Sequence, residues 1–495
     1  MSQPARFSSR LGLILSVLGI AVGTGNIWRF PRIAAKMGGD EGAGAFLLAW
    51  ASFLLLWSIP LIIAEYGMGR IARKGVVGSF ARIAGPAFAW MGGFVAFVAT
   101  AIMFYYSVVA GWCIYFTQHT ALNALPADAE AALATWETFQ ATGWMPVFFH
   151  ALAMFGGAMI CFRGIGSIEK ANRFLVPALL AIVLISVGRA LTLPGAFEGV
   201  QYLFTPQWSQ LSEPTLWLEA LTQNAWDTGA GWGLILTYGA YMRHQDGVVK
   251  NAFITGIGNN LVSLLAALMV FGTVFAVLGT TMARPEILDV MRSSGPASTG
   301  LTFVWMPVLF AQMALGRVLS TVFFLGLAFA AFSSLISMIE LATRVLIDRG
   351  ISRKAAIFGV ASVGFLAGTP SALNLNVFAN QDFVWGVGLM ISGGFVAFAV
   401  ARYGKAFMTD MAEGAVGDWT AGSLWWRVVT VLVPIQAVVL LVWWMTLSAT
   451  SYAPDRWFDP FDAFSVMTCL AQWGLVLALL LLFNRRLTKS VDVSA

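Results

Sequence analysis

Six oxygen-bearing side chains fall within or beside long apolar stretches of the sequence, where they could bind a dehydrated cation. They are Asn26, Asp227, Thr228, Asn259, Ser333 and Ser334. Hard cations such as sodium prefer oxygen ligands, and an acidic residue inside an apolar stretch is costly and usually functional. The three cysteines form no CxxC pair and the three histidines show no metal-ligand spacing, so we expect no catalytic residues and no enzyme.

Two glycine-rich stretches, residues 19–25 and 229–233, interrupt the apolar segments that carry Asn26 and Asp227. In hydrocarbon, an unwound backbone persists only where protein, ion or substrate satisfies its amides and carbonyls. A half-helix that begins at mid-membrane offers amides to an anion such as a carboxylate, and one that ends there offers carbonyls to a cation. The pattern therefore indicates a carrier that binds an amino acid together with sodium.

The composition is that of a multi-pass membrane protein, because 59% of the 495 residues are hydrophobic and only 11% are charged. Apolar runs of about 20 residues predict transmembrane helices. We expect twelve, centred on residues 22, 57, 103, 154, 180, 230, 268, 332, 361, 391, 436 and 474. Most Lys and Arg residues fall on segments that place both termini in the cytoplasm and the chain in the inner (plasma) membrane. The net charge of +5 thus reflects topology, and no nucleic-acid partner is needed to explain it.

The expected fold is an all-α polytopic membrane protein with two inverted five-helix repeats. A cytoplasmic segment, residues 1–10, precedes the first repeat at 11–190; an external loop, 191–216, leads to the second repeat at 217–402. Each repeat begins with a broken helix, helix 1 or helix 6, and five spans per repeat force opposite orientations. Residues 403–495 hold helices 11 and 12 and a cytoplasmic tail, and these helices would face lipid or the second subunit of a homodimer. Residues 283–313 are expected to form a lid over the site.

Five segments are similar to one known family. They are RLGLILSVLGIAVGTGNIWRFP, IPLIIAEYGMGR, YYSVVAGW, GWGLILTYGAYM and FSSLISMIE. They resemble the neurotransmitter:sodium symporter family, whose bacterial members include the leucine transporter, over about residues 6–400. The resemblance implies a twelve-helix, inverted-repeat fold with two sodium sites beside one central substrate.

Matching motifs assign ligands to both sodium ions. The first site would use the Ala21 carbonyl, Asn26, Asp227, Asn259 and the substrate carboxylate. The second would use the carbonyls of Gly19, Val22 and Ala330 and the hydroxyls of Ser333 and Ser334. Without the resemblance, the serines could bond back to their own helix and the asparagines could link neighbouring helices.

The same comparison places the substrate between the two breaks. Tyr106 and the Thr24 and Gly25 amides would bind its carboxylate, although Tyr106 could also be a packing residue. Gly23 stands where amine-transporting relatives have Asp, so the substrate should supply its own carboxylate. Asp227 and Ser334 border this region, and apolar or small residues would surround the side chain: Ile20, Ile102, Trp226, Gly229, Trp232 and Met338. A hydrophobic or aromatic amino acid fits best.

Asp227 is the informative departure, because the family usually has Ser or Thr there, beside the first sodium site and the chloride site of animal members. The neighbouring chloride-site positions are Trp50, Gln223, Asn259 and Ser263. We expect Asp227 to supply the fixed anion that chloride supplies elsewhere, which makes transport chloride-independent. When sodium leaves, it could take up a proton and carry it outward. The alternative role is a helix cap at the start of the second half of span 6.

Two gates follow from the resemblance. Arg29 and Asp382 match the external pair, with Trp226 where a Phe usually closes the pocket. Tyr241 and Asp348 match the internal latch, but Arg6 and Phe7 replace its usual Arg-x-x-Trp pattern. Two further acids, Glu65 and Glu340, are expected to pair with backbone amides at helix ends or with each other.

The sequence thus predicts sodium-coupled uptake of an amino acid by alternating access. A sodium-coupled carrier of an organic amine, with Asp227 as the counter-charge, is one rival. A transporter-like receptor that binds without translocating and a channel are others, although the density of Trp and Phe around the breaks argues against a pore.

Overall fold

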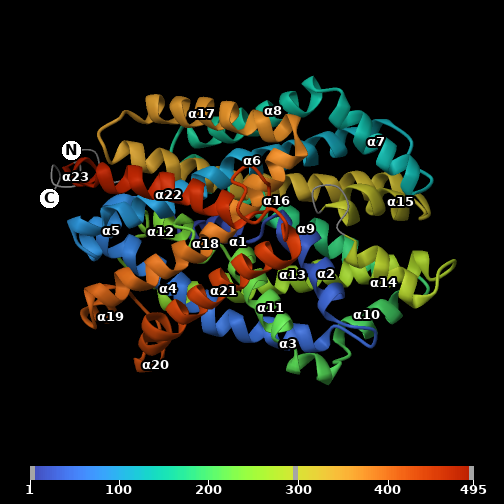
Figure 1. Cartoon of the computed structure of the whole chain (residues 1–495), viewed down its shortest axis with the longest axis horizontal. Helices are drawn as coiled ribbons and strands as arrows, with labels where there is room; N and C mark the ends of the chain where they lie inside the picture. The colour runs from blue at the N-terminus through green and yellow to red at the C-terminus, as the bar shows by residue number, and fades with distance from the viewer. Residues whose placement is uncertain (1–5, 294–298, 490–495) are drawn as a thin grey trace.

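The computed structural model describes residues 6–293 and 299–489. Residues 1–5 of the predicted N-terminal segment, 294–298 of the predicted lid and the last residues of the predicted tail lie outside this part. The longest helices are α6 (Ala89–Leu122), α8 (Trp144–Cys161), α9 (Ile165–Leu191), α13 (Val249–Leu278), α16 (Gly316–Ile347), α17 (Arg353–Leu373) and α18 (Leu375–Tyr403). They run roughly side by side in one helical bundle (Figure 1).

Other apolar helices are joined or interrupted by π-helical turns. One continuous helical stretch combines α3 (Gly44–Phe53), a π-helical turn (Leu54–Ser58) and α4 (Ile59–Ala72). Another runs from α20 (Ser423–Arg427) through π-helical turns at Val428–Leu432 and Ser448–Tyr452 on either side of α21 (Val433–Leu447). Among the described residues, nine helical stretches are long and apolar enough to cross a membrane. The bent pair α1 (Arg10–Ala21) and α2 (Thr24–Met37) makes up to ten.

The two remaining predicted positions contain shorter helices. Near residue 230, α11 (Pro214–Asp227) and α12 (Leu234–Gly239) flank a non-helical stretch, and α22 (Val466–Leu482) is an apolar helix of 17 residues. The structure therefore confirms an all-helical polytopic protein.

Short helices lie mainly at the two ends of the bundle. One end carries α5 (Val76–Ile83), α19 (Ala406–Asp410) and α23 (Asn484–Lys489). The other carries α7 (Ala129–Ala141), α10 (Ala196–Phe204), α14 (Arg284–Arg292) and α15 (Met306–Ala311) (Figure 1). Within the predicted lid, a π-helical turn at Leu301–Trp305 lies between α14 and α15, and Phe303 packs against Trp28 of α2 with ring centroids 6.1 Å apart.

Both predicted helix breaks are present. The first spans only Val22 and Gly23, and α1 and α2 meet there at a bend of 48°. The second runs from residue 228 to 233, where Gly229, Gly231 and Gly233 have φ of +65°, +86° and +79°. These are left-handed conformations that side chains disfavour. Gly231 also needs its small size, because a β-carbon there would lie 2.8 Å from Cα of Gly393.

Candidate functional site

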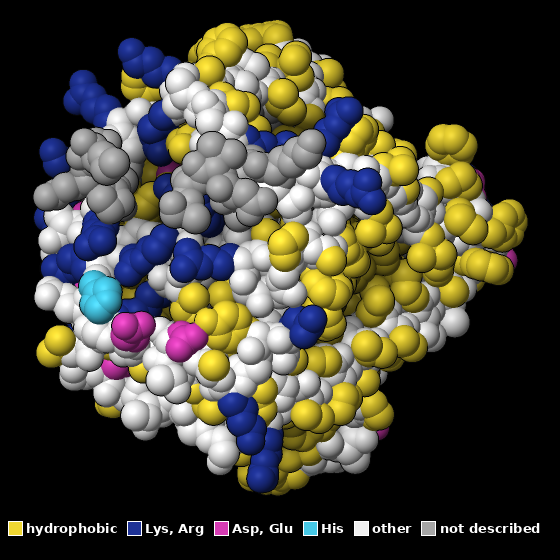
Figure 2. Space-filling view, turned by 90° about the vertical axis from the view of Figure 1, so that its left-hand side faces the viewer, with side chains coloured by type: hydrophobic (Ala, Val, Ile, Leu, Met, Phe, Trp, Pro, Cys, Tyr) yellow, Lys and Arg dark blue, Asp and Glu magenta, His cyan; other side chains and the backbone are white. Residues whose placement is uncertain are grey.

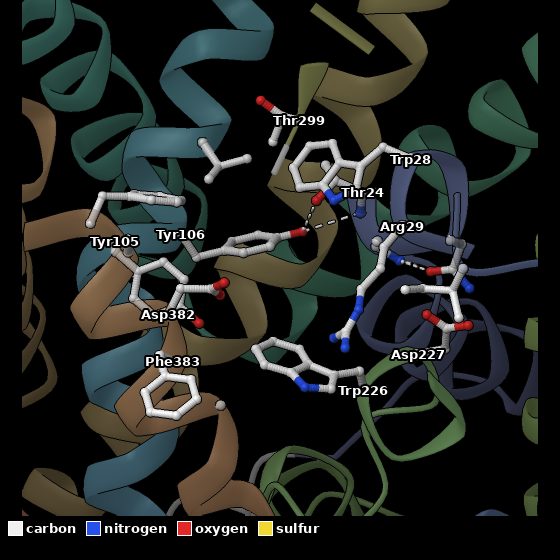
Figure 3. A pocket seen from close by; sticks show the side chains of 18 of the residues that line it. Thr24, Trp28, Arg29, Tyr105, Tyr106, Trp226, Asp227, Thr299, Asp382 and Phe383 are labelled. Carbon is white, nitrogen blue, oxygen red and sulfur yellow. Dashed lines mark hydrogen bonds between the residues drawn. The ribbon is translucent and has the colours of Figure 1, made fainter. Parts of the chain in front are cut away.

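The first break presents the start of α2 to the interior of the bundle. The hydroxyl of Tyr106, on α6, lies 3.4 Å from the Thr24 amide nitrogen and 3.2 Å from its hydroxyl (Figure 3). Tyr106 thus lies at a helix N-terminus, which favours negative charge. A carboxylate that bound here would meet the Tyr106 hydroxyl and the first amides of α2 together.

A cavity of about 590 Å³ lies beside this contact and reaches the second break. Most residues predicted to bind substrate line it: Ile20, Gly23, Thr24, Gly25, Tyr106, Trp226, Asp227, Gly229, Trp232, Ser334 and Met338. Ile102 is fully buried and is not among the residues that line the cavity, so its contact with substrate stays a prediction. Val109, three residues beyond Tyr106 on the same face of α6, lines it instead.

Aromatic side chains that the sequence analysis did not single out add to the lining. They include Trp28, Tyr105, Phe378 and Phe383. Trp226 and Trp232 pack edge to face at 5.6 Å, and the Trp232 indole donates a hydrogen bond to the Ala225 carbonyl at 3.2 Å. Trp226 lies in the last turn of α11 and Trp232 lies within the second break, so their packing holds the break against the end of α11.

Oxygen atoms converge where the two breaks meet α13. The Gly23 amide donates to Oδ1 of Asn26 at 2.9 Å, and the Asn26 amide donates to Oδ1 of Asn259 at 2.8 Å. The Asn259 amide in turn donates to Oδ1 of Asn260 at 3.2 Å. This chain directs Oδ1 of Asn259 toward the main-chain carbonyls of Ala21 and Asp227, each 3.1 Å away.

An amide flip at Asn259 would turn those two approaches into hydrogen bonds, but it would set the Asn259 nitrogen against the donor nitrogen of Asn26. We therefore keep the oxygen facing the carbonyls. Three oxygens that approach one another without a hydrogen between them repel, and a cation bound among them would relieve the repulsion. Four of the predicted first-site residues, Ala21, Asn26, Asp227 and Asn259, are thus together.

A second oxygen cluster lies between α1 and α16. The Ser334 hydroxyl lies 3.2 Å from the carbonyls of both Gly19 and Ile20, and the Ser333 hydroxyl donates to the Ala330 carbonyl at 2.9 Å. Both serines are buried. The structure brings these predicted second-site residues together. Val22, the remaining predicted ligand, is the C-cap residue of α1, and its amide donates to the Leu18 carbonyl at 2.7 Å.

The Asp227 carboxylate makes separate hydrogen bonds beside the oxygen cluster that its own carbonyl joins. Its Oδ1 accepts a hydrogen bond from the Gln223 amide at 2.6 Å, and the Ser263 hydroxyl lies 3.5 Å from Oδ2. Ser263 also accepts from the Asn26 amide at 2.7 Å, so this carboxylate joins the first cluster through two hydrogen bonds. Asp227 is the last residue of α11, and α12 has Gly233 at its N-cap. The alternative role as a cap of the second half-helix is therefore wrong.

The predicted external pair is not joined. Arg29 and Asp382 both line the cavity, yet no ion pair connects them within the described part of the chain. The Arg29 guanidinium instead lies over the Trp226 ring, 5.1 Å from its centroid, with Asp382 on the opposite side of the cavity (Figure 3). A gate formed by this pair remains a prediction.

We expect Arg29→Ala to lower the initial rate of sodium-driven uptake about tenfold or more. The variant loses a cation–π contact of about 0.5–2 kcal/mol and a cation that shares the cavity with Asp382. Uptake into proteoliposomes, normalised to protein content, is the measurement. Arg284→Ala is the matched control, because Arg284 lies in the same way over Tyr202, 5.2 Å from its centroid, outside the cavity lining. Equal rates in Arg29→Ala and the wild type would contradict the assignment.

Tyr241 and Asp348 do not contact each other, but Arg344 of α16 lies between them. Its guanidinium is 5.1 Å from the Tyr241 ring centroid and pairs with Asp348 at 2.9 Å. Burial raises the pKa of Asp348, while Arg344 and the Gly75 amide act in the opposite direction. Arg344 is not among the residues predicted from the sequence, although its spacing of four residues from both Glu340 and Asp348 could have indicated it.

Glu340 was expected to pair with backbone amides or with Glu65, and this was wrong. The Tyr241 hydroxyl donates to it at 2.6 Å, and Arg353 forms an ion pair with it. Glu65 does have a backbone partner, because the Gly233 amide donates to it. Phe7 is buried and packs edge to face on Tyr238 at 5.7 Å. Phe7 also lies beside Tyr241, because its amide donates to the Tyr241 carbonyl at 3.1 Å, whereas Arg6 is exposed. The latch itself remains a prediction.

Comparison with known proteins identifies the family. The model of the Sodium:neurotransmitter symporter family matches residues 5–143 and 146–488. The chain belongs to this family. Like the family, it is a sodium-dependent transporter in a membrane and not an enzyme.

Relatives of this chain include transporters that are named for different substrates. An uncharacterised sodium-dependent transporter of Methanocaldococcus jannaschii is 33% identical over 368 residues, 72% of this chain and 73% of its own. The sodium-dependent serotonin transporter of Drosophila melanogaster is 27% identical over 478 residues, 87% of this chain and 74% of its own. The crystal structure of MhsT in complex with L-phenylalanine is 31% identical, with a TM-score of 0.76, and the match covers 88% of this chain and 99% of that one.

Proposed function

We propose that this protein takes up an amino acid with a hydrophobic or aromatic side chain across the plasma membrane, driven by sodium. One observation carries the proposal. The cavity at the two helix breaks has an anion-binding helix start at Thr24 and Tyr106, and oxygen clusters at Asn259 and at Ser334. These are the features that a zwitterion and accompanying cations require.

The cavity lining supports the substrate class. Around the substrate side chain it offers Ile20, Val109, Trp226, Trp232 and Met338, which are all apolar or aromatic. At the first break, Gly23 provides no carboxylate for an amine. MhsT, a relative of known structure, is in complex with L-phenylalanine, which agrees with a pocket for an aromatic amino acid.

Two sodium ions would bind at the two oxygen clusters, the first beside the substrate carboxylate. Each sodium contributes about 2.3 kcal/mol per 100 mV of membrane potential to uptake. Coupling requires that ion and substrate favour the same conformation, and a carboxylate that shares the first ion would provide this link. Asp227 would stand in for chloride as the fixed anion, and a proton returned on Asp227 remains part of the proposal.

The proposed topology has twelve spans. The pairs α1–α2 and α11–α12 would each form one broken span and α22 the last, with inverted repeats at residues 11–190 and 217–402. The end of the bundle that carries α5 and α23 exposes many Lys and Arg side chains and few acids (Figure 2). Under the positive-inside rule, this end faces the cytoplasm and both termini lie there. Spans 1, 2, 6 and 7 would rock against the rest of the bundle during alternating access, with the two broken spans as hinges.

Ligand-dependent thermal stability tests the function. We expect L-phenylalanine to raise the melting temperature of the purified protein when sodium is present and to have little effect in potassium. A ligand at 100 times its Kd stabilises the folded state by about 2.7 kcal/mol. Phenethylamine, the same molecule without its carboxylate, should stabilise far less, because the Thr24 and Tyr106 contacts would have no anion to bind.

Other outcomes would select the rival functions. Stronger stabilisation by phenethylamine than by L-phenylalanine would favour the amine carrier, whose counter-charge would be Asp227 or Asp382 in the cavity lining. Sodium-dependent stabilisation without counterflow in liposomes would favour a receptor that does not translocate.

A further inference from the structure

The interface between α1 and α9 contains a buried amide side chain without a hydrogen bond. Asn172 is fully buried, and neither its Oδ1 nor its Nδ2 has a partner among the described residues. On α1, Ser16 is also fully buried, and its hydroxyl likewise has no partner there. Buried polar groups are nearly always hydrogen-bonded, and intramembrane polar groups usually serve function. Two such groups at one interface point to a ligand.

Asn172 is directed toward the second oxygen cluster. A methyl group built on Gly19 would lie 3.3 Å from Oδ1 of Asn172 and 3.1 Å from Cβ of Ser333. Gly19 is also the residue whose carbonyl lies 3.2 Å from the Ser334 hydroxyl. Asn172 therefore adjoins this cluster from the α9 side, and a larger residue at position 19 would crowd the approach between them.

Helical periodicity continues the contact between α1 and α9 toward the start of α1. Gly12, Ser16 and Gly19 are spaced by four and three residues and so lie on one face of α1. Glu169 and Asn172 are three residues apart and share a face of α9. A methyl group built on Gly12 would overlap Oε1 of Glu169, at 1.8 Å. Ser16, between the two glycines, therefore faces the turn of α9 that joins Glu169 to Asn172.

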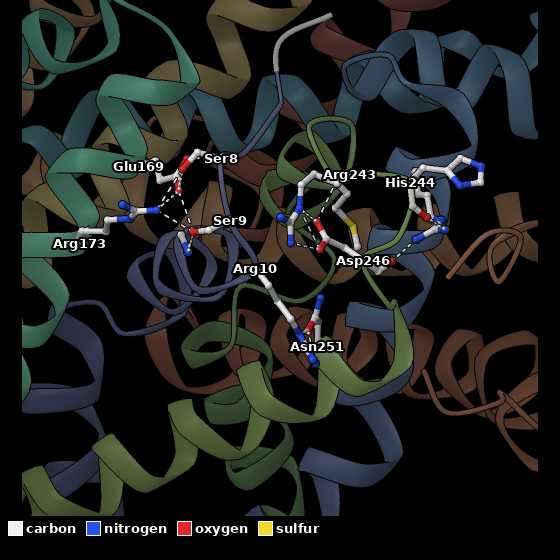
Figure 4. Close-up of polar contacts among 12 residues, drawn as sticks. Ser8, Ser9, Arg10, Glu169, Arg173, Arg243, His244, Asp246 and Asn251 are labelled. Carbon is white, nitrogen blue, oxygen red and sulfur yellow. Dashed lines mark hydrogen bonds and ion pairs between the residues drawn. The ribbon is translucent and has the colours of Figure 1, made fainter. Parts of the chain in front are cut away.

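Glu169 closes this row where the chain enters α1. It accepts hydrogen bonds from the Ser8 amide at 2.7 Å, from the Ser8 hydroxyl at 2.6 Å and from the Ser9 hydroxyl at 3.2 Å, and it pairs with Arg173 at 2.7 Å (Figure 4). The carboxylate is 3% exposed. These contacts hold the segment before α1 against α9, so the row of polar groups is shut at this end.

We propose that Asn172 and Ser16 form a transit site for a sodium ion that leaves the second cluster toward the cytoplasm, with Glu169 and its serine contacts as the inner gate. The inference rests on the proposed sodium coupling. An amide oxygen and a hydroxyl are hard ligands without charge, so the site would bind sodium weakly enough to release it, as conduction requires. The Asn172 amide nitrogen would bind water that travels with the ion.

Net uptake and exchange separate this role from a structural one. Sodium-driven uptake of L-phenylalanine into proteoliposomes requires sodium to be released inside. Counterflow of L-phenylalanine with equal, saturating sodium on both sides requires no net sodium release. We expect Asn172→Leu, which keeps the branching of the side chain and removes its polar atoms, to lower net uptake about tenfold and to leave counterflow and the sodium concentration for half-maximal binding within twofold of the wild type.

Ser16→Ala should also lower net uptake, by a smaller factor than Asn172→Leu, and should leave counterflow unchanged. Ser320→Ala is its matched control, because Ser320 of α16 is equally buried and its hydroxyl is also unpartnered among the described residues; it should change neither rate. Unchanged net uptake in Asn172→Leu would show that the pair holds only water and would overturn the proposal. An equal fall in uptake and counterflow would overturn it too, because that indicates a structural role. Absence of sodium-driven uptake in the wild type would instead reject the proposed function together with this inference.

Discussion

Replacing Asp227 by serine should lower sodium-driven uptake about 100-fold in chloride-free medium. Adding chloride should restore part of the uptake of this variant. The Asp227 carboxylate is bonded to Gln223 and reaches the first cation cluster through Ser263 and Asn26. Removal of its charge leaves a bound sodium without a nearby anion, and a 100-fold loss corresponds to about 2.7 kcal/mol. Serine would leave room for chloride beside the same hydrogen-bond donors.

The wild type should transport equally well when gluconate replaces chloride, and initial uptake rates in the two media measure this. Asp227→Asn is the control, because it removes the charge without vacating the space, so chloride should not rescue it. A strong loss of wild-type uptake in gluconate would end the idea of a fixed anion. Equal uptake rates of Asp227→Ser with and without chloride would also end this idea.

The helix breaks could be predicted because glycine leaves a direct signature. Gly229, Gly231 and Gly233 adopt left-handed conformations, and three glycines within five positions weaken any helix that the apolar segment could otherwise form. The family resemblance implied that Asn26, Asp227 and Asn259 meet, and each of them lies in a span where a polar group needs a partner. The two oxygen clusters could thus be predicted from residue type together with a strong family resemblance.

Other parts of the site depend on contacts that sequence spacing leaves open. Ile102 and Val109 are both spaced to lie near the Tyr106 face of α6, and only the packing of the bundle decides that Val109 borders the cavity. Arg344 lies between the predicted latch residues Tyr241 and Asp348, where the resemblance implied an arginine of the N-terminal segment. Arg29 lies over Trp226 and not against Asp382, because the side chain of an arginine can reach several partners from one backbone position.

The backbone conformation of the second break should depend on one acidic residue outside the cavity, Glu65. Glu65 of α4 is fully buried and accepts a hydrogen bond from the Gly233 amide at the start of α12. Loss of this acceptor would leave the buried Gly233 amide unpaired, at a cost of about 1–3 kcal/mol, and removal of the side chain would leave a cavity that costs a similar amount. Glu65→Ala should therefore destabilise the protein by about 3 kcal/mol and abolish sodium-dependent substrate binding, because Gly229 and Trp232 line the cavity from the same stretch.

Glu65→Gln separates the hydrogen bond from the charge. Its amide oxygen can still accept from Gly233, so we expect a smaller fall in melting temperature and measurable binding of L-phenylalanine in sodium. Thermal unfolding and binding of the purified variants give both quantities. If Glu65→Ala melted at the wild-type temperature, the break would be held by its own glycines and by the Trp226–Trp232 packing alone. If Glu65→Gln were as unstable as Glu65→Ala, the charge at the start of α12, and not the hydrogen bond, would be the dominant interaction.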